Sequence, residues 1–112
     1  MDNEIKKWLF DIVQCIDRIE TFIGDKKLFA SYENNLLIQQ AVERNFEIMG
    51  EAKGRILNKM PEILITNKRR IVDTRNKIIH GYDEIEPQNI WNIIINHLPL
   101  LKIEVETLLT HS

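Results

Sequence analysis

The sequence predicts an all-α protein, an up-and-down bundle of four or five helices with short connections. Apolar residues recur every three or four positions along almost all of the 112 residues, which is the spacing of an amphipathic helix. Glycine and proline stand between these periodic segments, where helices end or begin. No segment shows the alternation of apolar and polar residues that a competing strand would need.

The first predicted helix runs from about Asn3 to Ile23. Gly24 follows it, at the place where a helix commonly stops. Within the helix, Trp8 is expected to anchor the core, and Cys15 to act as a small buried hydrophobe rather than as a nucleophile. The apolar positions that share one face are Ile5, Trp8, Leu9, Ile12, Cys15, Ile16, Ile19 and Ile23.

The second predicted helix covers residues 31–57, with Ser31 as its N-cap. It carries an unusually wide apolar stripe, formed by Leu37, Ile38, Ala41, Val42, Phe46, Ile48, Met49, Ala52 and Ile56. A single narrow line of polar residues runs along it, namely Arg44, Glu47, Glu51 and Arg55. Such a helix is covered on more than one side, as in a bundle core or a dimer interface.

Two further helices follow a connection that begins at Pro61. The third is predicted from about Thr66 to residue 79 or 80, before Gly81. Pro87 suits the first position of the fourth, and Pro99 should kink or split that helix because proline has no N–H to donate. The inward positions of the fourth helix are Ile90, Trp91, Ile94, Ile95, Leu98, Leu101, Val105 and Leu108.

The composition indicates one domain, residues 1–112, that we expect in the cytoplasm. A single cysteine rules out an internal disulfide and fits a reducing compartment. The longest apolar runs are too short to span a bilayer, and acids occupy the region that a signal peptide would keep apolar. A net charge of −2 gives the whole molecule no attraction to DNA or to an anionic membrane. Neither is expected as a partner.

One segment departs from this acidic balance. Residues 66–80 hold five cationic side chains against one acid, Asp73, and so carry a local charge of +4. A solvated helix face would explain the presence of charge but not its single sign. A local basic patch is the pattern expected where a polyanion is bound. The residues that we expect to bind RNA here, besides Arg75, are Lys68, Arg69, Arg70 and Lys77.

The end of this segment has the chemistry that RNA cleavage needs. The guanidinium of Arg75 could bind two phosphate oxygens as a fork, and the amide of Asn76 could orient a water or a phosphate. Imidazole titrates near neutral pH, so His80 could take the proton of a 2′-hydroxyl or give one to the leaving oxygen. No metal is needed, and His97 and His111 lie at no spacing that suggests a metal site.

The five positions between Arg75 and His80 raise a geometric difficulty. On one unbroken helix they lie about 140° and about 7.5 Å apart. They meet at one ligand only if the helix ends near His80 and its ring swings round, or if a second subunit contributes its own pair. The sequence leaves both possibilities open.

Three segments resemble one known family. "RNKIIHGY" (75–82) has the form R-N-x3-H-x-Y and resembles the catalytic motif of the HEPN superfamily in its HepT-like branch. "AVERNFEIMGEA" (41–52) is similar to the second-helix signature of that branch, and "IWNIIINHLPLL" (90–101) to its last-helix pattern. The resemblance covers nearly the whole chain and implies a HEPN-like helical bundle that forms a symmetric homodimer.

The resemblance also implies an activity and its control. Arg75 and His80 would catalyse metal-independent RNA cleavage without a cofactor, helped by Asn76, in a cleft that two subunits share. The protein would be the endoribonuclease toxin of a type VII-like toxin–antitoxin pair. Its partner, a minimal nucleotidyltransferase antitoxin, would silence it by AMP transfer to Tyr82, adding negative charge and bulk beside the cleft.

A different class of function stays open. The wide apolar face of the second helix would also suit a non-catalytic subunit that holds a nucleotidyltransferase or presents a substrate to it. The presence of both Arg75 and His80 favours the enzyme, because a docking subunit needs neither.

Overall fold

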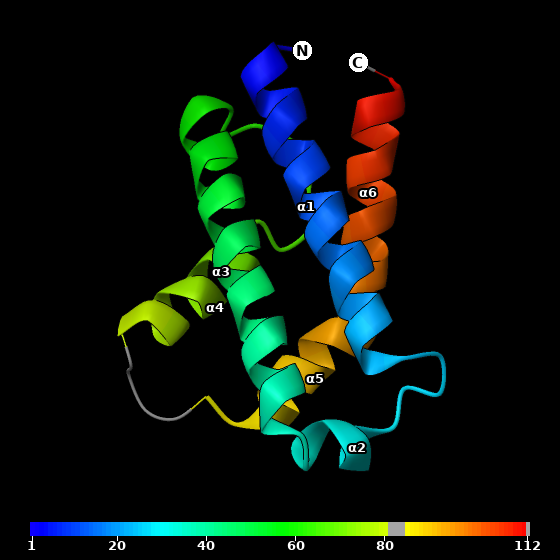
Figure 1. The fold of residues 1–112 in the computed structure, drawn as a ribbon. Coiled ribbons are helices and arrows are strands. Elements are labelled where there is room, and N and C mark those ends of the chain that lie inside the picture. The colour runs from blue at the N-terminus through cyan, green and yellow to red at the C-terminus, as the bar shows by residue number, and fades with distance from the viewer. Residues whose placement is uncertain (81–84, 112) are drawn as a thin grey trace.

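The computed structural model describes residues 1–80 and 85–111, and over these ranges the chain is helical with no strand. The prediction of an all-α fold is confirmed. The described helices are α1 (Asn3–Ile23), α2 (Phe29–Glu33), α3 (Leu36–Lys59), α4 (Arg70–His80), α5 (Pro87–Asn96) and α6 (Leu98–Thr110) (Figure 1). None of them is both long and apolar enough to cross a membrane.

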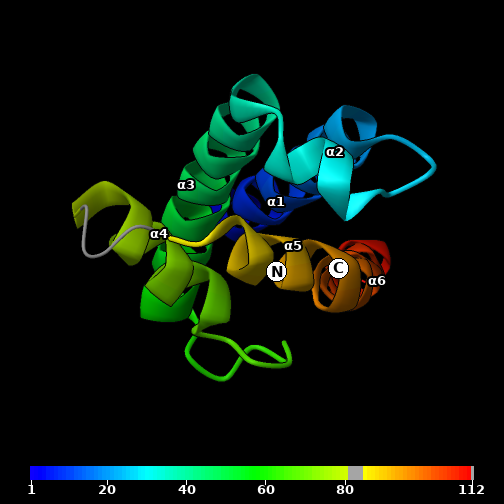
Figure 2. The same cartoon turned by 90° about the horizontal axis from the view of Figure 1, so that it is seen from below.

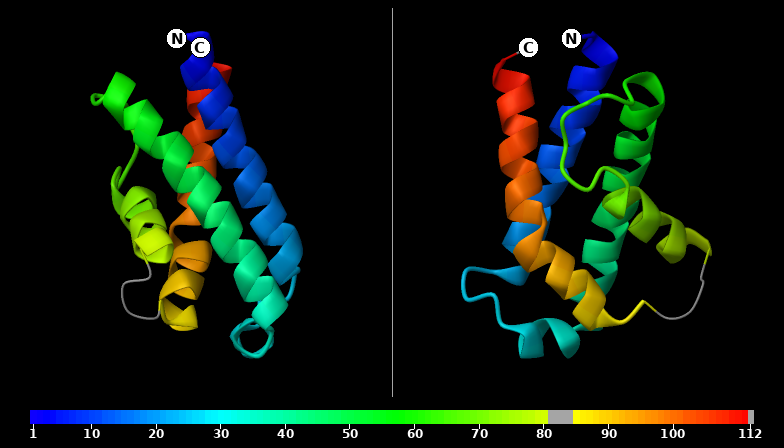
Figure 3. Two further views of the ribbon diagram at one scale, coloured as in Figure 1. Left: turned by 60° about the vertical axis from the view of Figure 1, so that its left-hand side comes forward. Right: turned by 180° about the vertical axis from the view of Figure 1, so that it is seen from behind.

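Three long helices form the body of the molecule. Helix α1 packs between α3 and α6, and the two ends of the chain lie at the same end of this layer (Figures 1 and 3). Helices α2 and α5 contact each other at the opposite end. Helix α4 has its main contact with α3, and in the view from below it lies on the side of α3 away from α2 and α6 (Figure 2). The helix that carries Arg75 and His80 therefore stands at the margin of the bundle.

Helix α1 begins and ends where the sequence predicts. The carboxylate of Asp2 caps it by accepting hydrogen bonds from the backbone N–H groups of Glu4 (2.8 Å) and Ile5 (3.1 Å). Gly24 ends it with a φ of 78°, in the left-handed region that glycine adopts without strain. Cys15 is buried, as expected, and burial raises the pKa of its thiol to about 11.

Helix α3 begins later than predicted, so the expectation that Ser31 is its N-cap is wrong. Ser31 lies inside the short helix α2, and the side chain of Asn35 caps α3 by accepting from the N–H of Ile38 at 3.0 Å. The break is stabilised by Gln39, whose amide donates to the carbonyls of Tyr32 (3.0 Å) and Glu33 (2.9 Å). The carbonyl of Tyr32 also accepts from the backbone N–H of Asn35 at 3.2 Å, so Gln39 adds a second donor there and provides one for the carbonyl of Glu33.

Helix α4 also begins later than predicted, at Arg70 instead of Thr66. The backbone N–H and the hydroxyl of Thr66 both donate to the carboxylate of Glu104 on α6. Asn67 has a φ of 51°, a left-handed conformation that does not fit a right-handed helix. The contact with α6 therefore keeps the start of this segment out of the helix.

The two prolines of the last predicted helix act as expected. Pro87 stands in the first turn of α5, and the helix divides between α5 and α6 just before Pro99. His97 stands at the division, where its N–H donates to the carbonyl of Ile93 (2.9 Å) and its own carbonyl accepts from Leu101 (3.0 Å). The chain thus changes direction with little loss of backbone hydrogen bonding.

The core is built around α1, and α3, α5, α6 and the connection before α4 add buried apolar side chains to it. The wide stripe of α3 is buried over most of its length, but at its start Leu37 is 77% exposed and the neighbouring Leu36 is 67% exposed. Two basic side chains of the described residues are buried with the apolar ones: Lys53 of α3 is 0% exposed and His97 is 3% exposed. The apolar pattern of the sequence does not predict the burial of Lys53.

Candidate active site

Arg75 lies in the middle of α4, on the side that faces α3. Its side chain is half-buried, and its stem rests on Gly50 of α3, where an added Cβ would lie only 2.2 Å from the Cβ of Arg75. Its Nη1 donates to Oδ1 of Asn76 at 3.3 Å. Its Nε is buried and has no hydrogen-bond partner among the described residues. The arginine is therefore held at both ends of its side chain.

His80 is the last residue of α4 and is exposed. Because α4 runs from Arg70 to His80 without a break, helical geometry sets Arg75 and His80 about 140° apart around its axis. Asn76, in contrast, is half-buried and directly bonded to Arg75. One chain thus joins Arg75 to Asn76 and sets His80 at a different side of the helix axis.

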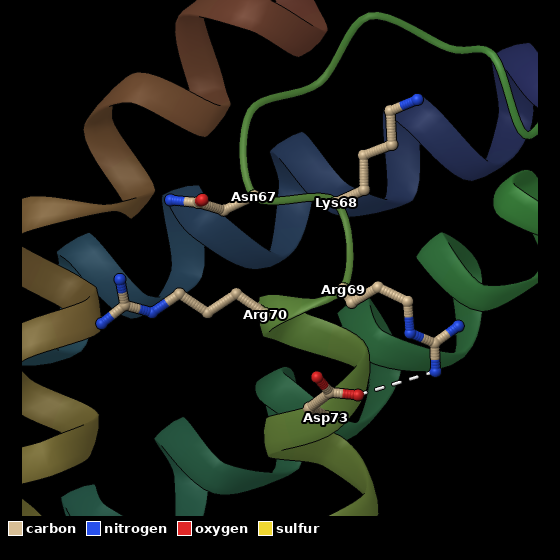
Figure 4. Close-up of a pocket in the computed structure, with 5 residues that line it drawn as sticks. All are labelled: Asn67, Lys68, Arg69, Arg70 and Asp73. Atoms are coloured by element: carbon tan, nitrogen blue, oxygen red, sulfur yellow. Dashed lines mark ion pairs between the residues drawn. The ribbon is translucent and has the colours of Figure 1, made fainter.

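The basic residues just before α4 and at its first position line an open hollow of about 650 Å³. It is lined by Asn67, Lys68, Arg69, Arg70 and Asp73 (Figure 4). The ammonium of Lys68 donates to the carbonyl of Pro61 at 2.8 Å, and Arg69 forms a 3.6 Å ion pair with Asp73.

These basic side chains do not converge. Figure 4 shows Arg70 directed away from Lys68 and Arg69. Lys77 is exposed further along α4. The arrangement is a spread of positive charge at the surface, suited to a backbone with several phosphates rather than to one small anion.

Tyr82, with Gly81, Asp83 and Glu84 beside it, lies outside the described residues. The other tyrosine is unsuited to modification. Tyr32 is 3% exposed, its ring centroid lies 5.4 Å from that of Trp91, and burial raises the pKa of its hydroxyl.

Sequence reasoning did not single out Gly50 as part of this site. The signal was present, because Gly50 interrupts the wide apolar stripe of α3 with a residue that helices disfavour. Over residues 1–80 and 85–111, no group of three or more histidine, cysteine or acidic side chains is placed to hold a metal ion.

Comparison with known proteins identifies the family. The family model described as Ribonuclease HepT-like matches residues 12–108. A protein of Methanocaldococcus jannaschii named "Putative RNase MJ1380" is 33% identical over 108 residues, which are 93% of this chain and 95% of the relative. A protein of Thermococcus cleftensis named "Probable ribonuclease HepT" is 32% identical over 112 residues, which are 96% of this chain and 98% of the relative. No solved structure gives a significant match. The chain belongs to the HepT-like ribonuclease family.

Proposed function

We propose that this protein is a metal-independent endoribonuclease in which Arg75 binds the scissile phosphate and His80 transfers a proton. The observation that carries the proposal is the contrast between the two side chains on α4, in a chain of a ribonuclease family. Arg75 is anchored against α3 and Asn76, whereas His80 is exposed at the helix end. An anchored cation suits phosphate binding, and an accessible imidazole suits proton transfer.

The reaction follows from these groups. The 2′-oxygen of the RNA attacks the adjacent phosphorus as an imidazole takes its proton, and the bond from phosphorus to the 5′-oxygen breaks as that oxygen gains a proton. The products are a 2′,3′-cyclic phosphate and a 5′-hydroxyl end. The arginine stabilises the negative charge that gathers on the phosphate oxygens in the transition state. DNA, which lacks the 2′-hydroxyl, would not be cleaved.

The cleft of the proposed enzyme is shared by two subunits. The divergence of Arg75 and His80 on one helix supports this, because a second α4 would supply the missing group from the opposite side. Ile79, which precedes His80, is 46% exposed, and such an apolar side chain beside the motif suits a contact between subunits. Lys68, Arg69, Arg70 and Lys77 of both chains would then bind the RNA backbone along two sides.

The proposed partner is a minimal nucleotidyltransferase that silences the enzyme by AMP transfer to Tyr82, as in a toxin–antitoxin pair. The burial of Tyr32 supports this choice of acceptor. Co-expression with the cognate nucleotidyltransferase should add one or more AMP units to Tyr82, and Tyr82→Phe should keep the cleavage activity but escape silencing. Intact-mass spectrometry with peptide mapping checks the acceptor. An unmodified protein would contradict the proposal.

Arg75→Ala and His80→Ala test the catalytic assignment. Each should reduce RNA cleavage by about a hundredfold or more, while a chelator leaves wild-type cleavage unchanged. Two matched controls lie at exposed positions away from α4, Arg18→Ala in α1 and His111→Ala, and both should cleave RNA at the wild-type rate. Variants at Arg75 or His80 that remain fully active would refute the assignment. RNA binding without cleavage by the wild type would favour a non-catalytic docking subunit instead.

A further inference from the structure

Helix α4 approaches α3 most closely where Gly50 faces Arg75. A Cβ added at Gly50 would lie 2.2 Å from Cβ and 2.7 Å from Cγ of Arg75, and 3.1 Å from the carbonyl oxygen of Ile71. Real Cβ atoms essentially never come closer than 3.0 Å to a heavy atom to which they are not bonded. The two helices therefore fit at this distance only because residue 50 has no side chain.

The contact involves the base of the arginine and not its flexible end. Rotating the side chain of Arg75 would not relieve the clash with its Cβ, because the backbone of α4 fixes the place of that atom. A side chain at position 50 would have to move α4 away from α3 or turn it. Either change would displace Arg75 and, with it, the bonded amide of Asn76.

A second glycine in the same helix shows that the close contact with α4 is specific to position 50. Gly54 lies one turn further along α3, and an added Cβ there would meet nothing within 4 Å. Glycine is less favourable than alanine inside a helix, so a glycine at either position weakens α3 locally. Only at Gly50 does the close approach of another helix explain why the residue is a glycine.

We propose that Gly50 is a positioning residue for the active site, one that sets the distance between α3 and α4 and thereby the place of the Arg75 guanidinium. This inference rests on the proposed function of Arg75 in phosphate binding. Gly50 itself touches no substrate. Its effect on catalysis passes through the arginine stem that lies on it.

The first test compares Gly50→Ala with the matched control Gly54→Ala. Because a displacement of about 1 Å in a positioned group can cost on the order of a hundredfold in rate, Gly50→Ala should lower kcat/KM for RNA at least about tenfold. Gly54→Ala should stay within about twofold of the wild type, since its new methyl group meets nothing. Equal activity of the two variants would overturn the proposal.

A double-mutant cycle separates positioning from loss of stability. The dissociation constant for an uncleavable 2′-deoxy analogue of the RNA is measured for the wild type, Gly50→Ala, Arg75→Ala and the double variant. Gly50→Ala should weaken binding strongly in the wild-type background and clearly less when Arg75 is already alanine, because only the other groups of α4 are then displaced. The variant Arg75→Ala still has a Cβ at position 75, the atom nearest to a side chain added at position 50. Any loss of stability caused by Gly50→Ala therefore persists in both backgrounds. An equal loss of affinity in both backgrounds would show a merely structural role.

A measurement without RNA keeps this inference apart from the proposed function. The buried Nε–H of Arg75 should give a side-chain resonance in a ¹H–¹⁵N spectrum, assigned by its absence from Arg75→Ala. It should shift or broaden in Gly50→Ala and stay in place in Gly54→Ala. If the wild type neither binds nor cleaves RNA, the proposed function fails while this readout still tests the position of Arg75. An unchanged resonance in Gly50→Ala would refute the inference alone.

If Gly50→Ala does not fold, the same contact is tested in reverse. Arg75→Gly removes the two atoms that an added Cβ would strike, so Gly50→Ala combined with Arg75→Gly should fold and melt close to Arg75→Gly alone. A combined variant that also fails to fold would contradict the assignment of the clash to the arginine stem.

Discussion

Two buried basic side chains, Lys53 and His97, shape the stability of this protein at the scale of single residues. The ammonium of Lys53 lies 3.5 Å from the carbonyl oxygen of Asn67, and burial lowers its pKa to about 8 although Glu104 acts in the opposite direction. Burial also lowers the pKa of His97 to about 4, and the positive charges of Lys53 and Arg70 act in the same direction. Both groups thus resist carrying charge in the folded state.

The low pKa of His97 makes stability depend on pH below neutrality. The imidazole takes up a proton near its ordinary pKa of 6.5 in the unfolded chain but only near 4 in the folded one, so acid favours unfolding across this window. The free energy of unfolding should therefore fall by up to about 3 kcal/mol as the pH drops from 7 to 4. Urea titrations across this range measure it. His97→Leu, which cannot titrate, is the comparison, and an equally steep fall in that variant would contradict the prediction.

The burial of Lys53 is expected to cost stability. At neutral pH the ammonium is charged in both states, and in the folded state it is taken out of water with one long hydrogen bond as compensation. Lys53→Met, which keeps the length of the side chain, should raise the free energy of unfolding at pH 7 by about 1–3 kcal/mol. It should also raise the pKa of His97, because it removes a neighbouring cation. Urea unfolding and an NMR titration of His97 measure the two effects. A destabilised Lys53→Met would show that the buried lysine is a net stabilising group.

The sequence predicted the burial of Cys15 but not that of Lys53, and the reason is physical. Cys15 lies on a periodic apolar face, so the pattern of its own helix predicts its environment. Lys53 is covered because the segment that holds Asn67 passes over it, and Glu104 of α6 fixes the neighbouring Thr66. These contacts join parts of the chain far apart in sequence, and no local pattern reports them.

At the scale of helices, the boundaries were predictable where one local capping group decides them. Gly24 and Pro87 act within a single turn, and α1 and α5 end and begin as expected. The start of α3 was not predictable, because Ser31 and Asn35 are both acceptable N-caps. The choice depends on Gln39, whose side chain reaches back to the carbonyls that end α2.

The two candidate caps of α3 can be compared directly by mutation. Asn35→Ala removes the acceptor for the N–H of Ile38 and should lower the free energy of unfolding by about 1 kcal/mol. Ser31→Ala, the matched control, changes an exposed position inside α2 and should stay within about 0.5 kcal/mol of the wild type. Denaturant unfolding of both variants measures the difference. A larger loss from Ser31→Ala would mean that the helix begins at α2 in solution.

At the scale of the whole molecule, the motif residues were predictable but their arrangement was not. Arg75, Asn76 and His80 follow from a local pattern, and the structure joins the first two directly. The part played by Gly50 depends on how two helices pack, and sequence periodicity does not predict the distance between them. Arg75 and His80 stand on one unbroken helix, about 140° apart around its axis.

A mixing experiment tests whether two chains complete each other. If each site takes Arg75 from one subunit and His80 from its partner, a mixed dimer of Arg75→Ala and His80→Ala chains has one intact site and one that lacks both groups. Equal mixing with free exchange makes about half of the dimers mixed, so about a quarter of the wild-type activity should return from two inactive preparations. Sedimentation should show a species of twice the 13.3 kDa chain mass, and activity per chain should fall on dilution below the dissociation constant of the dimer.

The control for the mixing experiment is His80→Ala mixed with itself under the same exchange conditions. A mixture that forms mixed dimers but stays inactive would mean that both groups must come from one chain, and a 13.3 kDa species with full activity would rule out the shared cleft altogether.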